Sequence, residues 1–365
     1  MKAQILYGIG NIKYAEIDKP LEKAGKAVVR VSKCGICGSD IPRIYKTGAH
    51  NMPIVPGHEF MGVVEKCRDL PGIVGKRVGI FPLIPCMECG QCKLGNYEMC
   101  SNYNYLGSRC DGGFAEYVSV PLWNLLPLAD EISDEAAAML EPMSVAVHAM
   151  RRANAEEKKD ASIVVCGLGT IGLLLSMFLK DAGCNNILFV GNKDIQKKKI
   201  LEMGFNDESY CDVRYGEPLS FIKKKTEGRG ADVYFECIGR SESYAQAVSA
   251  VAPLGKVVLI GNPASDMELP REVYWKILRG QLCIIGNWNS SFRGRDAEDT
   301  EMNPEPDDWR YVISRLGKKA LSPEILITHR FDLEGMTEGL DIMRKKSEEY
   351  IKIMIECNKK TFLYD

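Results

Sequence analysis

Two hydrophobic patterns divide the 365-residue sequence. Up to about residue 148, short β-rich runs alternate with Gly and Pro, which is typical of an antiparallel, turn-rich domain. From about residue 150, apolar strands alternate with helical segments of about 10 to 15 residues, and this rhythm predicts βαβ units and a parallel sheet. The strands predicted in the first part are 27–31, 63–66, 77–81 and 114–120.

The second part predicts a doubly wound α/β domain, and its end is marked by a change of pattern. Its predicted strands are 163–166, 187–190, 233–237, 257–260 and 283–286, and its predicted helices include 170–181 and 193–203. The polar stretch 287–308, with Pro304 and Pro306, interrupts the rhythm. We expect a first domain over 1–148, a dinucleotide-binding domain over 149–286, and a segment 287–365 that returns to the first domain.

Composition and charge narrow the possible partners. The 47 Lys and Arg residues nearly balance the 49 Asp and Glu residues, so the net charge of −2 offers no broad field for nucleic acid or an anionic membrane. The short basic runs at 197–199, 223–225 and 344–346, the last of which begins with Arg344, indicate solvated helix faces. The N-terminus lacks a signal-peptide pattern and no apolar run approaches about 18 residues, which predicts a cytoplasmic protein outside the membrane.

Four of the fourteen cysteines lie in one short segment. Cys86, Cys89, Cys92 and Cys100 form C-x2-C-x2-C-x7-C, and four thiolates around a tetrahedral Zn²⁺ leave no position for a substrate. The spacing therefore predicts a structural zinc site, although unligated cysteines and an iron–sulfur cluster remain alternatives. Other cysteines, such as Cys34 and Cys166, are expected to be small core residues.

A second candidate metal site is spread over three segments. CGICGSD (34–40), GHEFMG (57–62) and EPMSVAVH (141–148) offer Cys37, His58 and Glu141 as one thiolate, one imidazole and one carboxylate. Three such ligands leave a fourth position open, as a catalytic zinc requires. Each segment alone is weak evidence, because a single His is more often a satisfied core residue than a ligand.

A glycine-rich turn follows the first predicted strand of the second domain. Gly167, Gly169 and Gly172 form G-x-G-x-x-G between an apolar strand and an apolar helix that begins at Thr170 and Ile171. The first Gly makes the turn, the second admits a pyrophosphate to the backbone, and the third lets helix and strand approach. The context predicts a Rossmann dinucleotide-binding site with phosphate at the helix N-terminus.

Taken in order, these motifs carry a family resemblance. The four-Cys segment, DGGFAEY (111–117) and the segments above resemble the zinc-containing medium-chain dehydrogenases and their polyol branch. IPRIYKTGAH (41–50), GSRCDGGFAEY (107–117) and WKILRGQLCIIGNW (275–288) are similar to the galactitol-1-phosphate 5-dehydrogenases within that branch. The resemblance spans the chain and implies a GroES-like catalytic domain, a nicotinamide cofactor and hydride transfer to or from a secondary hydroxyl.

The resemblance also implies roles for individual residues. It makes Cys37, His58 and Glu141 the catalytic zinc ligands, Glu59 an alternate or water-bridged ligand, and Asp40 a hydrogen-bond partner that orients His58. For Glu59 and Asp40, purely structural hydrogen bonding is the alternative. Ser39 matches the hydroxyl that accepts the alcohol proton, with a turn residue as the alternative. Pro42 stands where many relatives have a relay His, so the proton needs another route.

Cofactor choice is predicted from the end of the second strand. An NAD enzyme normally has an acidic residue there for the ribose 2′-hydroxyl, but Val190 is followed by Gly191, Asn192 and Lys193. We interpret these three residues as a site for a 2′-phosphate: Gly191 leaves space for the group, Asn192 donates a hydrogen bond to it, and Lys193 supplies a positive charge. This predicts NADP(H) over NAD(H), while Asp194 could still bind the ribose if the turn differs by one residue.

The substrate remains a choice between related compounds. A carboxylate in the zinc shell suits polyols, and Arg43, Lys46 and Arg109 are candidate cations for a phosphate group, with ordinary surface charges as the alternative. A sorbitol or L-iditol dehydrogenase, a threonine dehydrogenase and a non-catalytic dinucleotide-binding protein are the competing functions. The resemblance further implies a homodimer or homotetramer in which the edge strand 283–286 pairs across subunits.

Overall fold

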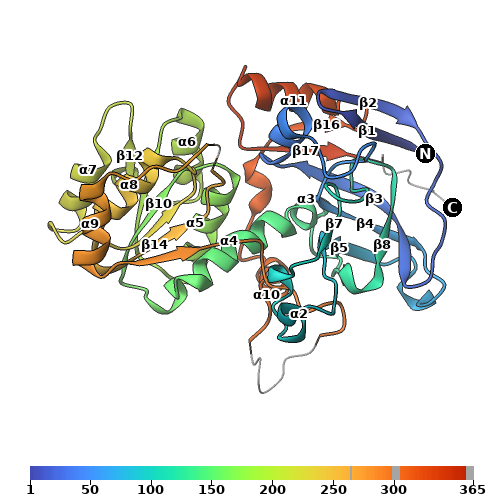
Figure 1. Ribbon diagram of the computed structural model, residues 1–365, viewed down its shortest axis with the longest axis horizontal. Helices are drawn as coiled ribbons and strands as arrows, with labels where there is room; N and C mark the ends of the chain where they lie inside the picture. The colour runs from blue at the N-terminus through green and yellow to red at the C-terminus, as the bar shows by residue number, and fades with distance from the viewer. Residues whose placement is uncertain (264, 298–304, 359–365) are drawn as a thin grey trace. The chain divides into compact units, whose positions relative to one another are not determined.

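The computed structural model describes residues 1–263, 265–297 and 305–358 (Figure 1). The chain divides into two compact units, one formed by Met1–Glu141 with Ser290–Asp365 and the other by Pro142–Asn289. The units change at 141/142, inside helix α4 (Leu140–Arg152), and at 289/290, whereas the sequence predicted changes at 148/149 and 286/287. Of the polar stretch 287–308, residues 298–304 with Pro304 lie outside the described residues.

The first unit is built on a seven-stranded sheet with the order β16-β17-β3-β4-β5-β9, in which β8 also pairs with β3. Neighbouring strands are antiparallel except β16 and β17, which are parallel. The strands are β3 (Lys26–Ile36), β4 (Glu59–Lys66), β5 (Arg77–Ile80), β8 (Tyr117–Pro121), β9 (Leu125–Pro127), β16 (Ile327–Asp332) and β17 (Lys352–Glu356). Two small sheets pair β1 (Lys2–Gly8) with β2 (Asn11–Glu16) and β6 (Leu83–Ile84) with β7 (Asn104–Tyr105).

Strand β3 positions the first candidate metal site. Its apolar residues pack into the core of this unit, and it runs on past the predicted end at residue 31 to Ile36. The chain therefore reaches Cys37 directly from a rigid, fully paired strand. On the other side of β3, the C-terminal strand β17 pairs with it so that Ile353 faces Ile36. Residues more than 300 positions apart thus meet beside Cys37.

Helices of the first unit are short and lie around this sheet. Ser133 caps α3 by accepting a hydrogen bond of 3.0 Å from the Ala136 amide, and Asp307 caps α10 by accepting from the Arg310 amide at 2.9 Å. Helix α11 packs against β16, and α3 packs against β3 and β4. The helices are α1 (Asp40–Pro42), α2 (Gly90–Lys93), α3 (Asp134–Ala138), α10 (Asp308–Gly317) and α11 (Met336–Lys345).

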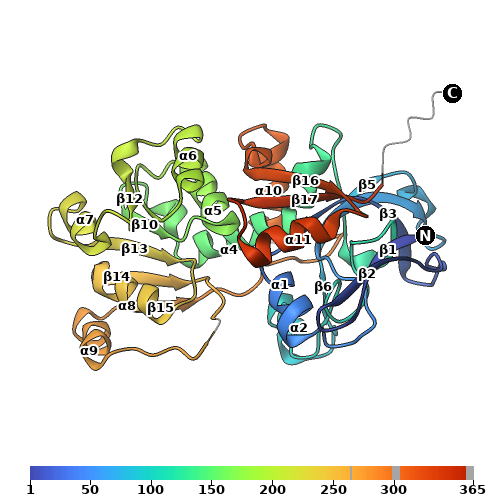
Figure 2. The same cartoon turned by 90° about the horizontal axis from the view of Figure 1, so that it is seen from above.

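The second unit is a six-stranded parallel sheet with the order β12-β11-β10-β13-β14-β15. Its first strand lies in the middle and the order reverses beside it, as in doubly wound nucleotide-binding folds. Figures 1 and 2 show α7, α8 and α9 on one face of the sheet and α5 and α6 on the other. The strands are β10 (Ser162–Cys166), β11 (Asn186–Gly191), β12 (Tyr210–Asp212), β13 (Ala231–Glu236), β14 (Val251–Leu259) and β15 (Cys283–Gly286), and the helices are α5 (Thr170–Asp181), α6 (Asp194–Glu202), α7 (Pro218–Lys225), α8 (Ser241–Ala250) and α9 (Arg271–Gly280).

The fold class predicted from the sequence, a doubly wound parallel sheet with a β-rich second domain, is confirmed. Helix α5 and strand β15 have the predicted bounds, because an uninterrupted apolar run and clear flanking glycines mark them. Strand β12 was missed, since its three residues carry too little pattern. Over the described residues, no helix combines the length and hydrophobicity that a membrane span requires.

Candidate metal centres and dinucleotide cavity

Cys37, His58 and Glu59 form a buried cluster in the first unit. Cys37 follows the end of β3, while His58 and Glu59 stand at the start of the neighbouring strand β4. One ligand atom from each of the three residues lies within 4.8 Å of the others. His58 is 4% exposed and Glu59 2%. A thiolate, an imidazole and a carboxylate at this spacing are suitable ligands for Zn²⁺.

The carboxylate of Asp40 contacts two of the cluster's segments, the Cys37 loop and His58. Its Oδ2 accepts a hydrogen bond of 3.0 Å from the Cys37 amide, its Oδ1 accepts from Arg43 Nη1 at 2.7 Å, and the same Oδ1 lies 3.4 Å from His58 Nδ1. Burial would raise the pKa of Asp40, but His58, Arg43 and the Cys37 amide lower it. The predicted contact between Asp40 and His58 is therefore present as a short approach of the two groups.

The electrostatics of the cluster favour a cation. Burial lowers the pKa of His58, yet the negative charges of Asp40 and Cys37 outweigh it and raise that pKa well above its usual value. Among the described residues, no group forms a hydrogen bond with the buried Nδ1 of His58, and Asp40 Oδ1 lies 3.4 Å from it. A site that raises the pKa of a buried imidazole in this way would be stabilised by a bound metal ion, so the donor set fits zinc.

Lys352 on β17 pairs with Glu59, and sequence reasoning did not identify it. Its side chain is 1% exposed, its Nζ is in direct contact with Glu59 Oε2, and the same Nζ donates to the Ile36 carbonyl at 3.0 Å. A Cβ at Gly35 would lie 2.5 Å from Glu59 Oε2 and 2.7 Å from Lys352 Cε. Gly35 thus has to be a glycine for this ion pair to fit. No local signal in the sequence links position 352 to position 59.

Glu141, near the start of α4, lies beside the cluster but outside the group whose ligand atoms are within 4.8 Å of one another. Its Oε1 accepts a hydrogen bond of 3.3 Å from the Tyr105 hydroxyl. Burial raises the pKa of Glu141 to about 7, although His58 acts in the opposite direction. Tyr105, whose ring centroid is 5.9 Å from that of His58, is a second residue that sequence reasoning missed.

The remaining predicted site residues of this unit differ in their surroundings. Ser39 Oγ donates to Cys37 Sγ at 3.3 Å. Arg43 forms an ion pair with Asp40, and Lys46 is exposed. The Arg109 guanidinium lies 4.4 Å from the centre of the Tyr103 ring.

The four cysteines of the lobe come together as closely as a single ion requires. All four sulfurs lie within 4.8 Å of one another, with Cys86 Sγ 4.0 Å from Cys92 Sγ and Cys89 Sγ 3.9 Å from Cys100 Sγ. A tetrahedral Zn²⁺ with bonds of about 2.3 Å sets its sulfurs about 3.8 Å apart. The geometry fits zinc, and no cysteine among the described residues is in a disulfide.

Backbone amides donate hydrogen bonds to sulfurs of this lobe. The Cys89 amide donates to Cys86 Sγ at 3.3 Å, and the Cys86 amide donates to Cys100 Sγ at 3.2 Å. Backbone amides, that of Cys92 foremost, lower the pKa of Cys89 to about 5. The lobe also packs onto an aromatic cluster, because the Tyr97 ring lies 5.1 Å from that of Trp123. Its ligands are thus preorganised mainly by local backbone.

The glycine-rich turn of the second unit has the predicted architecture. Gly167 has a φ of +93°, and a Cβ there would lie 2.6 Å from Ile238 Cγ1. A Cβ at Gly172 would lie 2.1 Å from the Gly167 carbonyl oxygen. A Cβ at Gly169, by contrast, would meet no atom within 4 Å. The outer two glycines serve close packing, while Gly169 caps α5 and leaves room for a ligand against the backbone.

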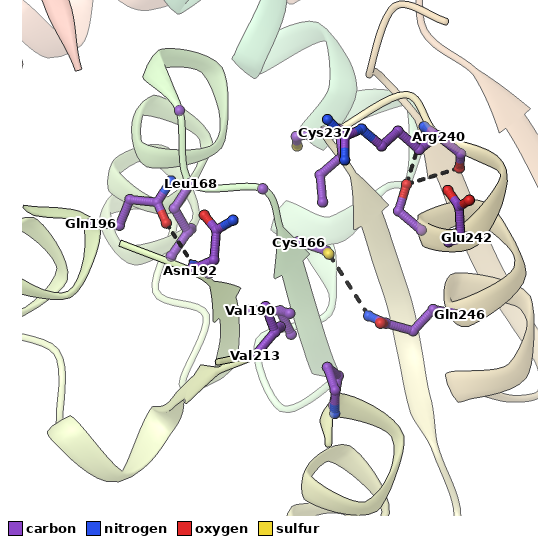
Figure 3. Close-up of a pocket in the computed structure, with 16 residues that line it drawn as sticks. Cys166, Leu168, Val190, Asn192, Gln196, Val213, Cys237, Arg240, Glu242 and Gln246 are labelled. Atoms are coloured by element: carbon purple, nitrogen blue, oxygen red, sulfur yellow. Dashed lines mark hydrogen bonds between the residues drawn. The ribbon is translucent and has the colours of Figure 1, made fainter. Parts of the chain in front are cut away.

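A cavity of about 540 Å³ lies at the carboxyl ends of the strands in this unit. Figure 3 shows Asn192 and Gln196 on one side of it and Arg240, Glu242 and Gln246 on the other. Four predicted residues line it, namely Gly167, Gly169, Gly191 and Asn192, whereas Thr170, Ile171, Gly172 and Lys193 do not. The other lining residues are Cys166, Leu168, Val190, Gln196, Val213, Pro218, Cys237, Ile238, Arg240, Glu242, Ser243 and Gln246.

One wall of the cavity is shaped by a buried carboxylate. Glu236, 1% exposed, accepts hydrogen bonds from the Ile238 amide at 2.8 Å, the Gly239 amide at 3.0 Å and the Ser243 hydroxyl at 2.8 Å. These bonds fix the loop after β13 against Gly167. Sequence reasoning did not identify Glu236, because an acidic residue at the end of a strand has many possible uses.

The turn after β11 corrects one detail of the sequence analysis. The space expected at Gly191 is filled, because a Cβ there would lie 2.7 Å from Tyr210 Oη and 2.8 Å from Gln196 Oε1. The Asn192 amide donates to Gln196 Oε1 at 3.0 Å, and the Tyr210 hydroxyl donates to the Lys193 carbonyl at 3.2 Å. Gly191 therefore allows the turn to pack tightly, and the room for a ligand lies beside Asn192.

Comparisons with known families agree with both units. Residues 23–130 match the model of the alcohol dehydrogenase GroES-like domain, and residues 170–303 match that of the zinc-binding dehydrogenase domain. Galactitol 1-phosphate 5-dehydrogenase of Escherichia coli is 31% identical over 352 residues, which cover 94% of this chain and 97% of that protein. The crystal structure of galactitol-1-phosphate dehydrogenase from Escherichia coli matches with a TM-score of 0.86 at 28% identity, over 98% of this chain and 100% of the other.

Two further relatives carry other names. Sorbitol dehydrogenase of Halalkalibacterium halodurans is 28% identical over 365 residues, covering 97% of this chain and 99% of that protein. The alcohol dehydrogenase RspB of Escherichia coli CFT073, solved in complex with NADH, matches with a TM-score of 0.85 at 25% identity, over 98% of this chain and 99% of the other. The relatives share a fold and a dehydrogenase activity, and they differ in the names of their substrates.

Proposed function

Since the chain belongs to the zinc-containing medium-chain polyol dehydrogenases, we propose that it transfers a hydride between NADP(H) and a secondary hydroxyl of a polyol phosphate, the class of substrate named for galactitol 1-phosphate 5-dehydrogenase. The observation that supports this most strongly is the buried cluster of Cys37, His58 and Glu59 with Glu141 beside it. The reverse reaction reduces the corresponding ketose. The similarity to the galactitol-phosphate enzyme over 94% of the chain favours a phosphorylated substrate.

We assign the catalytic zinc to Cys37, His58 and Glu141. Of the two carboxylates, Glu59 already has its charge paired by Lys352, whereas Glu141 accepts a hydrogen bond from the neutral Tyr105 hydroxyl and has a raised pKa. Glu141 therefore gains more from a cation, and Glu59 is kept as an alternate or water-bridged ligand. The four-cysteine lobe would hold a second, structural zinc through Cys86, Cys89, Cys92 and Cys100. Bound zinc supplies a Lewis acid that lowers the pKa of a substrate hydroxyl, and the nicotinamide supplies the hydride acceptor.

The chain's own residues orient the ligands and move the proton. Asp40 holds the Cys37 loop and faces His58 Nδ1, so that the other ring nitrogen would be the one to bind the metal. Ser39 Oγ, which is 3.3 Å from Cys37 Sγ, is placed to take the hydroxyl proton of a substrate at this site. Because the side chain of Pro42 has no group that can accept or donate a proton, the proton leaves through water or another group. Ser39→Ala should lower kcat sharply while cofactor binding persists.

Recognition of a phosphate is assigned to Arg43, Lys46 and Arg109. Arg109 keeps its Nε buried without a hydrogen-bond partner, and Lys46 is exposed. Arg43 is the weakest of the three candidates, because Asp40 already occupies its Nη1. If these cations do not serve a phosphate, the second candidate is a sorbitol or L-iditol dehydrogenase, which the similarity to the Halalkalibacterium halodurans enzyme favours.

Initial rates of the zinc-loaded enzyme separate the candidates. The panel contains galactitol-1-phosphate, sorbitol-6-phosphate, free galactitol, free sorbitol and threonine, each with NAD⁺ and NADP⁺. Activity confined to the phosphorylated polyols supports the proposal and justifies Lys46→Ala and Arg109→Ala, each of which should raise KM for the phosphorylated substrate only. Equal or higher kcat/KM for free sorbitol would replace it with the second candidate.

NADP(H) over NAD(H) rests on the turn after β11. Gly191 and Asn192 line the cavity there, and neither is acidic. Lys193 adjoins them as the N-cap residue of α6, so the helix N-terminus and a cation lie together. The ratio of kcat/KM for the two cofactors measures the preference directly.

A homodimer or homotetramer is proposed from the free edge of the second sheet. Strand β15 is the last strand in that sheet, and the neighbouring helix α9 exposes Tyr274 (54%), Trp275 (48%) and Leu278 (51%). An exposed sheet edge beside large apolar side chains is typical of a surface that a second subunit covers. Light scattering of the purified protein gives the number of subunits.

A further inference from the structure

An arginine from the turn after strand β12 holds the acidic side chain next to the cofactor turn. Asp194, the first residue of α6, is the acidic residue that the sequence left as a possible ribose ligand. Its side chain is 83% exposed, it does not line the cavity, and its Oδ1 accepts a hydrogen bond from Arg214 Nη2. Asp194 is thus engaged by a cation outside the cavity.

Arg214 is itself fixed by a second carboxylate. Asp212, at the end of β12, accepts hydrogen bonds from Arg214 Nε at 2.9 Å to Oδ1 and from Nη2 at 2.6 Å to Oδ2. This two-pronged pairing sets the plane of the guanidinium, as carboxylate–arginine pairs do. Asp212 is 16% exposed, so the pair is partly shielded from water. The arginine is therefore presented in one orientation.

The segment that carries Arg214 is part of the cavity wall. The Val213 amide donates to the Gly191 carbonyl at 3.0 Å, and Val213 lines the cavity (Figure 3). Tyr210, at the start of β12, donates a hydrogen bond from its hydroxyl to the Lys193 carbonyl. Arg214 is therefore one residue from the wall and is tied to the turn that would face the adenosine ribose.

One nitrogen of the guanidinium has no acceptor in the protein. Nε and Nη2 are occupied by Asp212 and Asp194, but Nη1, with two N–H groups, donates to no residue of the described chain. A fixed guanidinium with a free nitrogen beside a lysine and a helix N-terminus is suited to an anion. The charged side chains in contact here are Arg214, Asp194 and Asp212, with Lys197 acting on Asp212, and Lys193 precedes Asp194 in the chain.

From these contacts we infer that Arg214 is a specificity-determining residue for the cofactor: it holds the Asp194 carboxylate away from the ribose and contributes, with Lys193, to binding of a 2′-phosphate. This inference rests on the proposed preference for NADP(H). An arginine near this strand end is a known chemical solution for accepting a 2′-phosphate. Here it comes from the turn after the following strand, β12, which the sequence around the cofactor turn does not show.

The test uses two cofactor fragments that differ only in the 2′-phosphate. Dissociation constants of 2′,5′-ADP and 5′-AMP are measured by calorimetry on the full-length, zinc-loaded protein, so neither substrate nor hydride transfer is involved. Arg214→Ala should weaken 2′,5′-ADP at least tenfold and change 5′-AMP less than threefold. Arg214→Lys should give an intermediate loss, because it keeps the charge and loses the fork.

Two further variants control for charge and for Asp194. Lys198→Ala removes a cation from the same helix, 73% exposed and away from the turn, and should change neither constant by more than twofold. Asp194→Ala should leave 5′-AMP unchanged and tighten 2′,5′-ADP. If Asp194→Ala weakens 5′-AMP instead, Asp194 binds the ribose and the inference is wrong.

The outcome also separates this inference from the proposed cofactor preference. A wild-type protein that binds 5′-AMP more tightly than 2′,5′-ADP contradicts the preference for NADP(H). An Arg214→Ala variant in which both constants shift equally, or neither shifts, contradicts the role of Arg214 whatever the wild-type ratio. Because Arg214 is on the surface of its unit, we expect each variant to fold, and circular dichroism checks this.

Discussion

The four-cysteine lobe takes its ligands from a single stretch, 86–100, whereas the Cys37 cluster draws on the end of β3, the start of β4, the start of α4 and strand β17. In the lobe, four identical donors surround one position and backbone amides stabilise the sulfurs. In the cluster, unlike donors meet, and buried charges such as Asp40 and Lys352 hold them. A closed, locally built site suits stability, and an open site assembled from distant residues suits catalysis.

The largest expected effect comes from removing a ligand of the open cluster. Cys37→Ser should lower kcat/KM by about 10⁴-fold, or about 5.5 kcal/mol at about 1.4 kcal/mol per tenfold, because the metal's contribution to the transition state is lost. Zinc content should fall from two per chain to one, and the melting temperature should change little. Metal analysis, initial rates and thermal unfolding check the three parts.

The matched control is Cys184→Ser, since Cys184 is a buried thiol whose Sγ points to the Ala155 carbonyl in the second unit. It should keep both zincs and wild-type rates. Retention of both zincs in Cys37→Ser would contradict the assignment of the open site.

The reverse effect is expected from the lobe. Cys89→Ser removes one of the four sulfurs, and a structural zinc contributes directly to folding. We expect the melting temperature to fall by about 10 °C, which corresponds to about 3–5 kcal/mol for a domain of this size. The kcat of the protein that remains folded should stay within a few-fold of wild type. Trp123 fluorescence is a suitable probe, because the Tyr97 ring of the lobe lies 5.1 Å from it.

Loss of activity in Cys89→Ser at temperatures where the fluorescence reports a folded lobe would break the comparison, because the two sites would then not be separable into structural and catalytic roles.

Lys352 tests whether the open cluster depends on a buried charge. Lys352→Met leaves Glu59 buried without its partner, and unpaired buried charges cost about 3 kcal/mol or more. Adding Glu59→Gln removes that charge, so the double variant should recover most of the lost stability. Denaturant unfolding of the two variants and of wild type measures the difference. Equal stability of the single and double variants would show that Glu59 and Lys352 are not energetically coupled.

The smallest effect is expected from Asp40→Asn. An amide keeps the size of the side chain but weakens its bonds to the Cys37 amide, Arg43 and His58. Changes to residues that orient metal ligands typically cost 10–100-fold in metal affinity or activity, so we expect an effect of about that size. Competition with a chromogenic chelator measures zinc affinity independently of turnover. An unchanged zinc affinity would restrict Asp40 to a structural role.

The same contrast explains how far the sequence could be read. The glycine-rich turn, helix α5 and the four cysteines are local patterns, and the structure has them at the predicted residues. Lys352 and Tyr105 could not be found, because their partners lie far away in the sequence. Lys352 meets Glu59 only when β17 pairs with β3, and the Tyr105 hydroxyl meets Glu141 only in the folded unit. The expectation of free space at Gly191 was wrong for a similar reason, since the Tyr210 hydroxyl on the following strand, β12, fills it.

The most direct test of the account is a stepwise removal of zinc. The enzyme is dialysed against increasing concentrations of a chelator, and zinc content, initial rate and melting temperature are measured on each sample. The account predicts that activity disappears with release of the first zinc while the melting temperature stays near its starting value, and that unfolding follows release of the second. Activity that persists after the first zinc is lost, or that declines only together with the fold, would contradict it.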